Sequence, residues 1–245
     1  MFTPERVADA RVLLRLLLGQ PRRGSHAQRL EGFYAPQAER YDAFRARLLH
    51  GREDLVRALD ARPGMSVVEL GCGTGANLEA LARAVPLGHL EHVTLVDLCR
   101  PLLAMARRRT AGLDNVAVVE ADATHWRPAA PVDRVYLAYA LTMMPAWEAV
   151  LDNALAMLAP GGRLGLVDFH LPASGSRLGN ALWRRWFAHD GVHLSARHLE
   201  ALKARLRTLH CEERRAPVPY LPGLRAPYYL FVGEKAPDAG RGGAT

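Results

Sequence analysis

The chain has 245 residues, of which 49% are hydrophobic, so it is long enough and apolar enough to bury a full core. These values exclude an intrinsically disordered chain. The formal net charge of +7 favours an anionic partner, and composition alone leaves that partner open between a nucleic acid and an anionic membrane surface.

The three cysteines lie far apart and include no C-x-x-C pair, so neither a disulfide framework nor a zinc site is expected. One apolar run, residues 12–18, is interrupted by Arg15 and lacks the cleavage site of a secretory signal. It is also shorter than the roughly 20 residues that cross a bilayer. We therefore expect a cytoplasmic protein, attached at most peripherally to the inner face of the membrane. No metal is expected, because the spacing is loose between His189, His193 and His198.

Residues 1–60 predict a helical extension ahead of the main domain. Within it, residues 4–18 have an amphipathic helical pattern in which Arg11 and Arg15 share one stripe beside a broad apolar face. Such a helix suits the boundary between lipid head groups and acyl chains, with its arginines on anionic lipid. Packing on the domain as a lid is the alternative, and the sequence leaves the two open.

From Pro63 onward, short β-branched runs alternate with helical patterns, which is typical of a parallel sheet covered by helices. The predicted fold class is α/β, a doubly wound and mostly parallel sheet in a domain of residues 61–235. Residues 236–245 are expected to be a disordered tail. The predicted strands are Ser66–Leu70, Val93–Leu98, Val116–Ala121, Arg134–Ala140, Arg163–Phe169 and Tyr228–Glu234. The later predicted helices are Trp147–Leu158, Leu178–Phe187 and Ser195–Leu209.

The stretch GCGTGA, residues 71–76, follows the first predicted strand and precedes a helical pattern. Glycines at Gly71, Gly73 and Gly75 leave backbone N–H groups and a helix N-terminus open to a ligand, with no Cβ in the way. This arrangement is typical of a nucleotide-type cofactor site. The pattern alone fits a nicotinamide dinucleotide as well as S-adenosylmethionine.

Acidic residues at three strand ends separate these two cofactors. Glu69 puts a carboxylate beside the glycine turn, where it would repel a pyrophosphate and attract the cationic sulfonium and amino groups of S-adenosylmethionine. Asp97 ends the second strand, where its oxygens suit both ribose hydroxyls. Asp122 ends the third strand, where its carboxylate suits the adenine amine while the Ala123 N–H meets a ring nitrogen. Either aspartate alone also suits a helix N-cap, but the set favours S-adenosylmethionine.

The motifs VVELGCGTGANLEAL, VTLVDLC, VVEADATHW and LAPGGRLGLVDFH occur in this order between Pro63 and His170. They resemble the successive motifs of class I S-adenosylmethionine-dependent methyltransferases. The resemblance implies a seven-stranded sheet whose last strand is antiparallel, and it implies that Tyr139 and Ala140 flank the methionine moiety of the cofactor. The predicted cofactor residues in this region are Glu69, Gly71, Gly73, Gly75, Asp97, Leu98, Asp122, Ala123 and Tyr139.

The N-terminal block, residues 25–53, and the segment of residues 218–235 resemble the bacterial N-methyltransferases of betaine-lipid synthesis. The resemblance implies that the chain trimethylates diacylglyceryl-homoserine, a lipid whose acyl chains stay in the membrane. It also implies that Tyr41, in the unit RYD, packs on the methionine end of the cofactor. Phosphatidylethanolamine and quinone methyltransferases are related and stay open as alternatives. An accessory subunit that binds the cofactor without turnover is the alternative of another class.

The acceptor site is predicted from residue chemistry. The stretch YALTMMPAW after the fourth predicted strand lacks the Asn/Asp-Pro-Pro-aromatic run that grips a flipped base, so no nucleic acid is expected. Its apolar character suits a lipid, although Met143 and Met144 also suit a core. Aromatic faces stabilise a methylated ammonium, and arginines pair with the homoserine carboxylate. The candidate substrate residues are Tyr34, Arg45, Arg47, His50, Arg52, Tyr220, Tyr228 and Tyr229.

Each transfer requires the acceptor amine to lose a proton, because an ammonium has no lone pair for attack. His170 follows the fifth predicted strand, at the sheet edge where doubly wound folds bind ligands, and is the first candidate base. A helix cap or a solvent-facing position would also explain this histidine. Tyr41 and Tyr139 complete the predicted catalytic set, and His50 is a further candidate for the proton.

Overall fold

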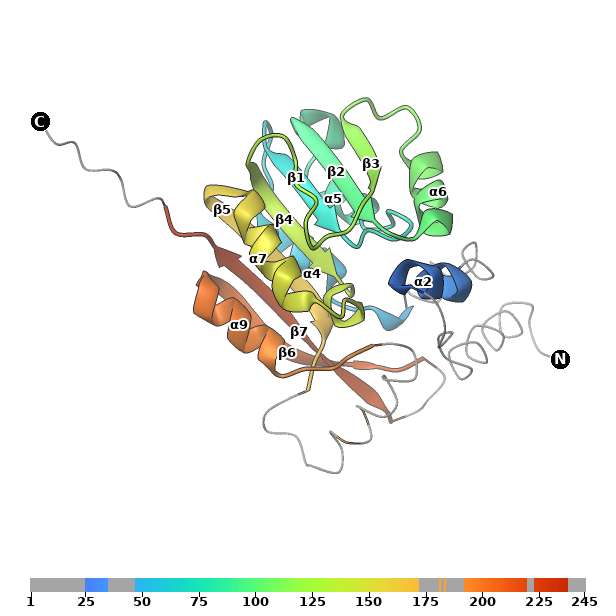
Figure 1. Cartoon of the computed structure of the whole chain (residues 1–245). Coiled ribbons are helices and arrows are strands. Elements are labelled where there is room, and N and C mark those ends of the chain that lie inside the picture. Colours follow the sequence, from blue (N-terminus) through green and yellow to red (C-terminus); the bar gives the residue numbers. More distant parts are fainter. Residues whose placement is uncertain are drawn as a thin grey trace, which may run out of the picture.

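One seven-stranded sheet forms the centre of the part of the chain that the computed structural model describes, which is residues 25–34, 47–171, 181, 183, 192–219 and 223–237. The strand order is β3-β2-β1-β4-β5-β7-β6 (Figure 1). The strands are β1 Ser66–Leu70, β2 His92–Asp97, β3 Val116–Glu120, β4 Val132–Ala138, β5 Leu158–Phe169, β6 Arg207–Pro217 and β7 Arg225–Glu234.

The sheet is parallel from β3 to β5, and β7 runs antiparallel to both of its neighbours, β5 and β6. The α/β class, the doubly wound sheet and the antiparallel strand near residues 228–234 are thereby confirmed. The parallel strands read as nearly continuous apolar runs because helices cover both of their faces.

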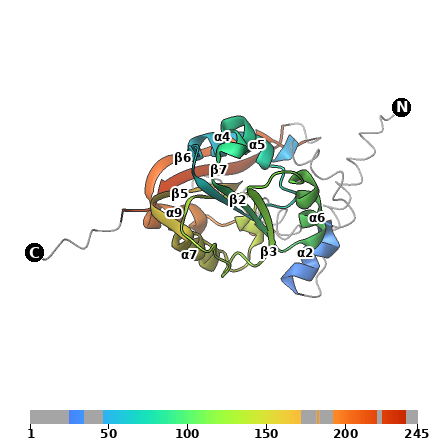
Figure 2. The same cartoon turned by 90° about the horizontal axis from the view of Figure 1, so that it is seen from above.

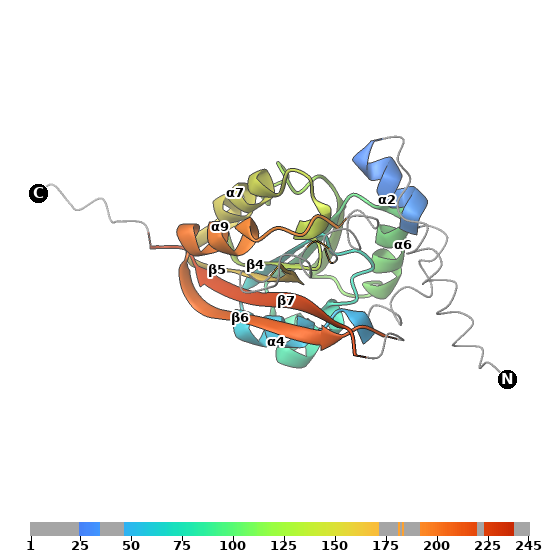
Figure 3. The same ribbon diagram turned by 90° about the horizontal axis from the view of Figure 1, so that it is seen from below.

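Helices cover the sheet on two sides, and each side has its own core cluster. One face carries α4 Arg52–Leu59, α5 Leu78–Ala84 and α6 Arg100–Arg109. The other face carries α7 Trp147–Met157 and α9 Arg197–Arg205. Figures 2 and 3 show α4 and α7 on opposite sides of the strands. The helix α2, His26–Tyr34, lies beside α6 in all three ribbon views, and two short 3₁₀ turns are η2 Leu87–His89 and η3 Leu141–Met143.

The chain reverses its path across the sheet at β1, which pairs with β2 on one side and β4 on the other. Strands β1 to β3 extend the sheet in one direction, and β4 and β5 then extend it in the other. Where neighbouring connections depart in opposite directions, a crevice opens beyond the carboxyl ends of the strands. This edge of the sheet is therefore where the fold would bind a ligand.

The helix predicted over Ser195–Leu209 was wrong at its end, because α9 stops at Arg205 and eleven residues of β6 follow. The sequence missed β6 because it is an edge strand that carries many charges, including Glu212, Glu213 and Arg214. Charged side chains protect an open strand edge from pairing with other chains, and they also remove the apolar alternation by which a strand is recognised.

The structure also refines the predicted N-terminal organisation. The helix α4 falls within the predicted extension, residues 1–60, yet Leu55, Val56 and Leu59 are buried in the core against the sheet. The structural unit therefore begins no later than Arg52. The amphipathic segment, residues 4–18, lies outside the described residues, as does most of the helix predicted over Leu178–Phe187. Among the helices of the described residues, none has the length and apolar character needed to cross a membrane.

Candidate active site

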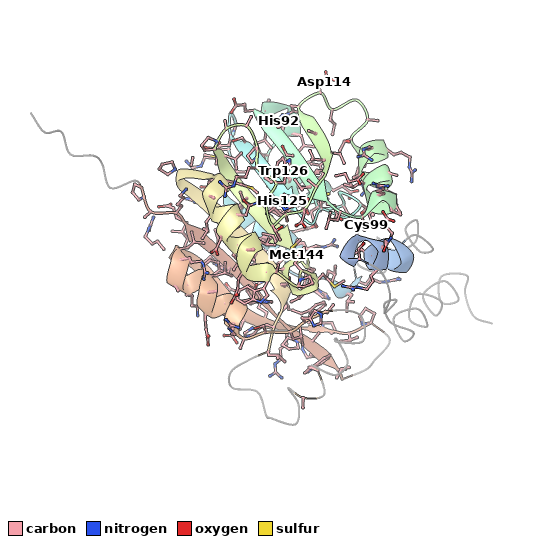
Figure 4. The ribbon with its side chains drawn as sticks, viewed as in Figure 1. His92, Cys99, Asp114, His125, Trp126 and Met144 are labelled. Atoms are coloured by element: carbon pink, nitrogen blue, oxygen red, sulfur yellow. The ribbon has the colours of Figure 1, made fainter. Side chains whose placement is uncertain are left out.

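A cavity of about 270 Å³ opens at the carboxyl ends of β1, β2, β3 and β4. One part of its lining comes from the glycine turn and the ends of β2 and β3, and another part comes from the segment after β4. Figure 4 labels one residue from each part, Cys99 at the start of α6 and Met144 beyond β4. Leu30 of α2 also lines the cavity, so this helix borders the site.

The glycine turn is folded against β2, because the N–H groups of Gly71 and Cys72 both donate to the Val96 carbonyl, at 2.8 and 3.1 Å. Gly71 has φ +72°, and a Cβ there would lie 2.4 Å from the Ala140 Cβ, so only glycine lets the turn approach the end of β4. A Cβ on Gly73, which has φ +56°, would meet only a Leu102 methyl group at 3.8 Å. Gly73 therefore exposes its backbone to the cavity, with no side chain between the backbone and a ligand.

Asp97 ties the glycine turn to the end of β2. One carboxylate oxygen accepts the Gly73 N–H at 2.8 Å, and the other accepts the Cys99 N–H at 2.8 Å. Asp97 and the following Leu98 both line the cavity. The Asp97 carboxylate therefore holds both the glycine turn and the residue that precedes α6, and it also borders the space where a ligand would lie.

Asp122 lies at the end of β3 and also lines the cavity. Its Oδ1 accepts the backbone N–H and the hydroxyl of Thr124, both at 2.8 Å. No helix follows it, since the next element along this continuously described stretch is β4 at Val132, so the alternative that Asp122 caps a helix is excluded. The predicted residues Asp97, Leu98, Asp122 and Ala123 are thus brought together in one lining.

Glu69 lies beneath the glycine turn and does not line the cavity. Its side chain is fully buried, with one oxygen accepting the Asn77 amide at 2.6 Å and the other accepting the Tyr136 hydroxyl at 2.8 Å. Burial raises the pKa of this carboxyl to about 7. Glu69 therefore braces the turn from below, and Gly75 likewise packs away from the lining, against Leu95 and Ala106.

Tyr139 directly follows β4 and lines the cavity, and its backbone has an unusual positive φ of +56°. Its hydroxyl donates to the His50 carbonyl at 2.7 Å, and its ring meets the Phe169 ring edge-on at 4.8 Å. Burial raises the pKa of the Tyr139 hydroxyl, so this group is a donor rather than a base. Gly51, which follows His50, has no room for a side chain, because a Cβ there would lie 2.8 Å from the Tyr228 ring.

His170 lies apart from the cavity lining. Its Nε2 lies 3.0 Å from a Glu213 oxygen on β6, and its ring meets the Tyr229 ring at 5.7 Å. Side chains alternate between the two faces of the sheet along β5, so His170 follows Leu164 and Leu166 on the face that α9 covers. Burial there lowers the pKa of His170. The solvent-facing explanation also fails, since the imidazole is buried.

The other predicted substrate residues are distributed as follows. Arg47 is exposed, Tyr228 is buried, and Arg52 donates to the Leu49 carbonyl at 3.2 Å. The Nε2 of His50 is buried without a partner among the described residues. Four predicted residues lie outside the described part, either entirely or in their side chains: Tyr34, Tyr41, Arg45 and Tyr220. Where the structure describes the chain, no cluster of His, Cys, Asp or Glu side chains is suited to a metal ion.

Two buried polar residues that the sequence reasoning missed support the cavity. Asn153 on α7 donates to the Ala123 carbonyl at 2.9 Å and to the Trp126 carbonyl at 2.8 Å. Asp168 near the end of β5 accepts hydrogen bonds from Thr142, in the turn beyond β4. The available signal was a polar residue at a position where the pattern expects an apolar one: Asn153 lies among the buried residues of α7, and Asp168 interrupts an apolar run of β5.

The lining fits the cofactor expected from the sequence. Two carboxylates at neighbouring strand ends suit the hydroxyl and amine donors of an adenosyl group, since a carboxylate accepts up to about four hydrogen bonds. The same two charges would repel a pyrophosphate. The bare backbone at Gly73 offers close approach without a Cβ, and the apolar segment beyond β4 excludes water.

Several known proteins with a similar sequence are methyltransferases, which agrees with the cofactor that the cavity lining suits. Residues 67–162 match a protein family described as a methyltransferase domain. A demethylmenaquinone methyltransferase of Clavibacter sepedonicus is 32% identical over 138 residues, which are 54% of this chain and 54% of that protein. The chain spans about half or less of the length of the first curated relatives it matches.

Two solved structures share the fold at low sequence identity. The N-methyltransferase NodS from Bradyrhizobium japonicum WM9, in complex with S-adenosylhomocysteine, has a TM-score of 0.64 at 20% identity, covering 86% of this chain and 99% of that one. Phosphoethanolamine N-methyltransferase 2 from Haemonchus contortus, in complex with S-adenosylmethionine, has a TM-score of 0.69 at 12% identity, covering 88% and 61%. Residues 67–162 therefore match the methyltransferase-domain family, and the sheet that carries them has the fold of these two methyltransferases, one bound to S-adenosylhomocysteine and the other to S-adenosylmethionine.

Proposed function

We propose that this chain is an S-adenosylmethionine-dependent N-methyltransferase that methylates the amine of diacylglyceryl-homoserine three times in succession. The observation that carries the proposal is that Asp97 and Asp122 line the same cavity as the apolar segment of residues 143–146. The carboxylate side suits an adenosyl group, and the apolar side suits the lipid part of an acceptor.

Binding of the cofactor is assigned to the described residues of the lining. Asp97 would accept the ribose hydroxyls, Asp122 would accept the adenine amine, and the bare backbone of Gly73 would border the methionine end. When bound, S-adenosylmethionine supplies an electrophilic methyl carbon on sulfur. The chain has to align a nucleophile in line with that bond and keep water away from it.

The acceptor side of the lining consists of Met143, Met144, Pro145 and Ala146, with no ionisable side chain among them. An apolar acceptor fits such a surface, which supports a lipid. The acceptor ammonium loses a proton before attack, and neither Tyr139, which is engaged as a donor, nor His170, which is paired with Glu213, is placed to take it. The amine nucleophile and the lipid identity are supported by the resemblance of residues 25–53 and 218–235 to betaine-lipid N-methyltransferases.

The lipid acceptor requires contact with a membrane surface. The net charge of +7 and the amphipathic pattern of residues 4–18 support peripheral binding to anionic lipid. A second candidate is methylation of a quinone ring, which the similarity to a demethylmenaquinone methyltransferase favours and which the same apolar surface would suit.

The full chain, incubated with methyl-labelled S-adenosylmethionine and anionic vesicles, tests the proposal. Separate vesicles carry diacylglyceryl-homoserine, phosphatidylethanolamine or demethylmenaquinone, and the extracted lipids are analysed for label. We expect label in the mono-, di- and trimethylated homoserine lipid. Label confined to phosphatidylethanolamine products or to the quinone would refute the proposed acceptor. Binding of S-adenosylhomocysteine without label in any lipid would instead indicate an accessory subunit.

A further inference from the structure

A buried carboxylate holds the turn that follows β4. Asp168, near the end of β5, is 1% exposed. Its Oδ1 accepts the Thr142 hydroxyl at 2.7 Å, and its Oδ2 accepts the Thr142 backbone N–H at 3.0 Å. Thr142 is also 1% exposed, and its carbonyl accepts the His193 N–H at 2.7 Å. Three atoms of Thr142 are therefore fixed by the protein around it.

Thr142 lies at the centre of η3, and Ala140 before it and Met143 after it line the cavity. Met143 donates its N–H to the Ala140 carbonyl, and Met144 donates to the Leu141 carbonyl, each at 3.0 Å. Ala140, Met143 and Met144 all belong to the lining. The position of the segment of residues 140–146, which we term the acceptor wall, therefore depends on how Thr142 is held.

The groups that donate to Asp168 are neutral. They are the Thr142 hydroxyl and the backbone N–H groups of Leu141, Thr142 and Phe169, the last at 2.8 Å. A carboxylate buried among neutral dipoles costs stability relative to an apolar side chain, so packing alone does not explain an acid here. Burial raises the pKa of Asp168 to about 6, which reflects this cost. An acid at this position is explained by the capacity of the Asp168 carboxylate to accept several hydrogen bonds at once.

We propose that Asp168 is a positioning residue for methyl transfer, which acts through Thr142 to fix the acceptor wall against the cofactor. The inference rests on the proposed function, because it assigns the wall to alignment of the methyl acceptor. Methyl transfer is sensitive to that alignment, and a displacement of about 1 Å can lower an enzymatic rate by about 100-fold.

Two substitutions test this role without removing the buried volume. In Asp168→Asn the side chain keeps only one acceptor oxygen. If the NH₂ group takes the place of Oδ2, the Thr142 N–H loses its acceptor, and if it takes the place of Oδ1, the Phe169 N–H loses its acceptor. Thr142→Val removes only the hydroxyl. Thr142→Ser keeps the hydroxyl and should restore the contact. A matched control is Thr110→Val, which removes a buried hydroxyl bonded to the Ala106 carbonyl at 3.0 Å, at the far end of α6.

The first readout is hydrogen–deuterium exchange of the acceptor wall in the full chain, which needs no enzymatic activity. We expect the amides of residues 141–144 and 146 to exchange at least about tenfold faster in Asp168→Asn and Thr142→Val, and at the wild-type rate in Thr142→Ser and Thr110→Val. Unchanged exchange in both Asp168→Asn and Thr142→Val would overturn the inference.

The second readout compares turnover with cofactor affinity. In Asp168→Asn and Thr142→Val, we expect kcat to fall by about tenfold more than the affinity for S-adenosylhomocysteine, measured by calorimetry. Equal losses in both quantities, or failure of Thr142→Ser to restore kcat, would refute a positioning role. If the wild-type chain methylates none of the acceptors, the proposed function fails, and the exchange experiment still decides whether Asp168 holds the wall.

Discussion

Asn153 on α7 donates a 2.9 Å hydrogen bond to the backbone carbonyl of Ala123, in the loop that brings Asp122 to the cavity. The same amide donates to the Trp126 carbonyl, so one side chain holds the loop at two points. In Asn153→Leu both carbonyls lose their buried donor, at a cost of about 1–3 kcal/mol. We expect the released loop to weaken binding of S-adenosylhomocysteine by about tenfold, measured by calorimetry.

Asn115 provides a matched control for that loss. Its amide also donates to two backbone carbonyls, those of Leu87 and Leu90, at 2.8 and 2.9 Å, near the opposite ends of the strands. Asn115→Leu should lower the free energy of unfolding by a similar amount and leave the cofactor affinity unchanged. Equal affinities in the two variants would show that Asn153 serves only stability.

Asp97→Asn should weaken binding of S-adenosylhomocysteine by at least about tenfold. The amide has a single acceptor oxygen, so either Gly73 or Cys99 loses its partner, and the negative charge that would meet the ribose hydroxyls is gone. The comparison is Asp133→Asn, because Asp133 accepts the Ser66 N–H at 2.9 Å near the amino ends of β1 and β4, away from the cavity. Titration calorimetry measures the affinity of both variants for S-adenosylhomocysteine. A similar loss of affinity in Asp133→Asn would argue against a direct role for Asp97 in binding.

Glu69 should make the stability of the protein depend on pH. Its pKa is raised from the usual 4.5 to about 7 in the folded state, so the folded state binds the proton more tightly than the unfolded state. The free energy of unfolding therefore decreases as the pH rises from about 4.5 to about 7, by about 3 kcal/mol for this group. Glu69→Gln lacks this dependence. Urea denaturation at pH 5 and pH 8 should show wild type losing more stability than the variant, and equal losses would contradict the assignment.

Gly71→Ala should destabilise the protein more than Gly112→Ala. Both glycines have positive φ values, +72° and +87°, so both alanines pay a backbone strain of about 1–2 kcal/mol. Only at Gly71 does the new methyl group collide, 2.4 Å from the Ala140 Cβ, whereas nothing lies within 4 Å at Gly112. We expect a further loss of about 1–3 kcal/mol at Gly71, measured by chemical denaturation. Similar losses would mean that the turn can move away from β4.

Deletion of residues 1–19 should weaken binding to anionic vesicles while the affinity for S-adenosylhomocysteine stays within about twofold. The deleted segment carries the amphipathic pattern, and the described cavity lining begins at Leu30. Co-sedimentation with vesicles of anionic lipid, repeated at high salt, measures the first quantity. If vesicle binding persists unchanged, the segment is no membrane anchor.

The sequence predicted the elements whose residues repeat a simple physical pattern. Strand β1 was predicted with both ends correct, because an apolar run leads directly into the glycine turn. The lining aspartates were found because each one closes an apolar strand. Strand β6 was missed because charges replace the apolar alternation at an exposed edge. Asn153 and Asp168 were missed because their roles depend on partners 30 and 26 residues away, Ala123 and Thr142, which no local pattern relates to them.

The direction of a side chain at a strand end was the hardest feature to predict. Glu69 and His170 both lie close to the expected edge of the sheet, yet each points away from the cavity. Successive residues of a strand face opposite sides, so a register error of one residue exchanges a ligand contact for a core contact. Three residues predicted at the acceptor site, Tyr34, Arg45 and Tyr220, remain predictions because their side chains lie outside the described residues.

The turn at His50 and Gly51 is caught between two tyrosines, since Tyr139 bonds to the His50 carbonyl and the Tyr228 ring leaves no space beside Gly51. This turn leads from the N-terminal region into α4, and Tyr139 lines the cavity. A displacement of this turn would therefore reach the cavity lining through the hydrogen bond between the His50 carbonyl and the Tyr139 hydroxyl.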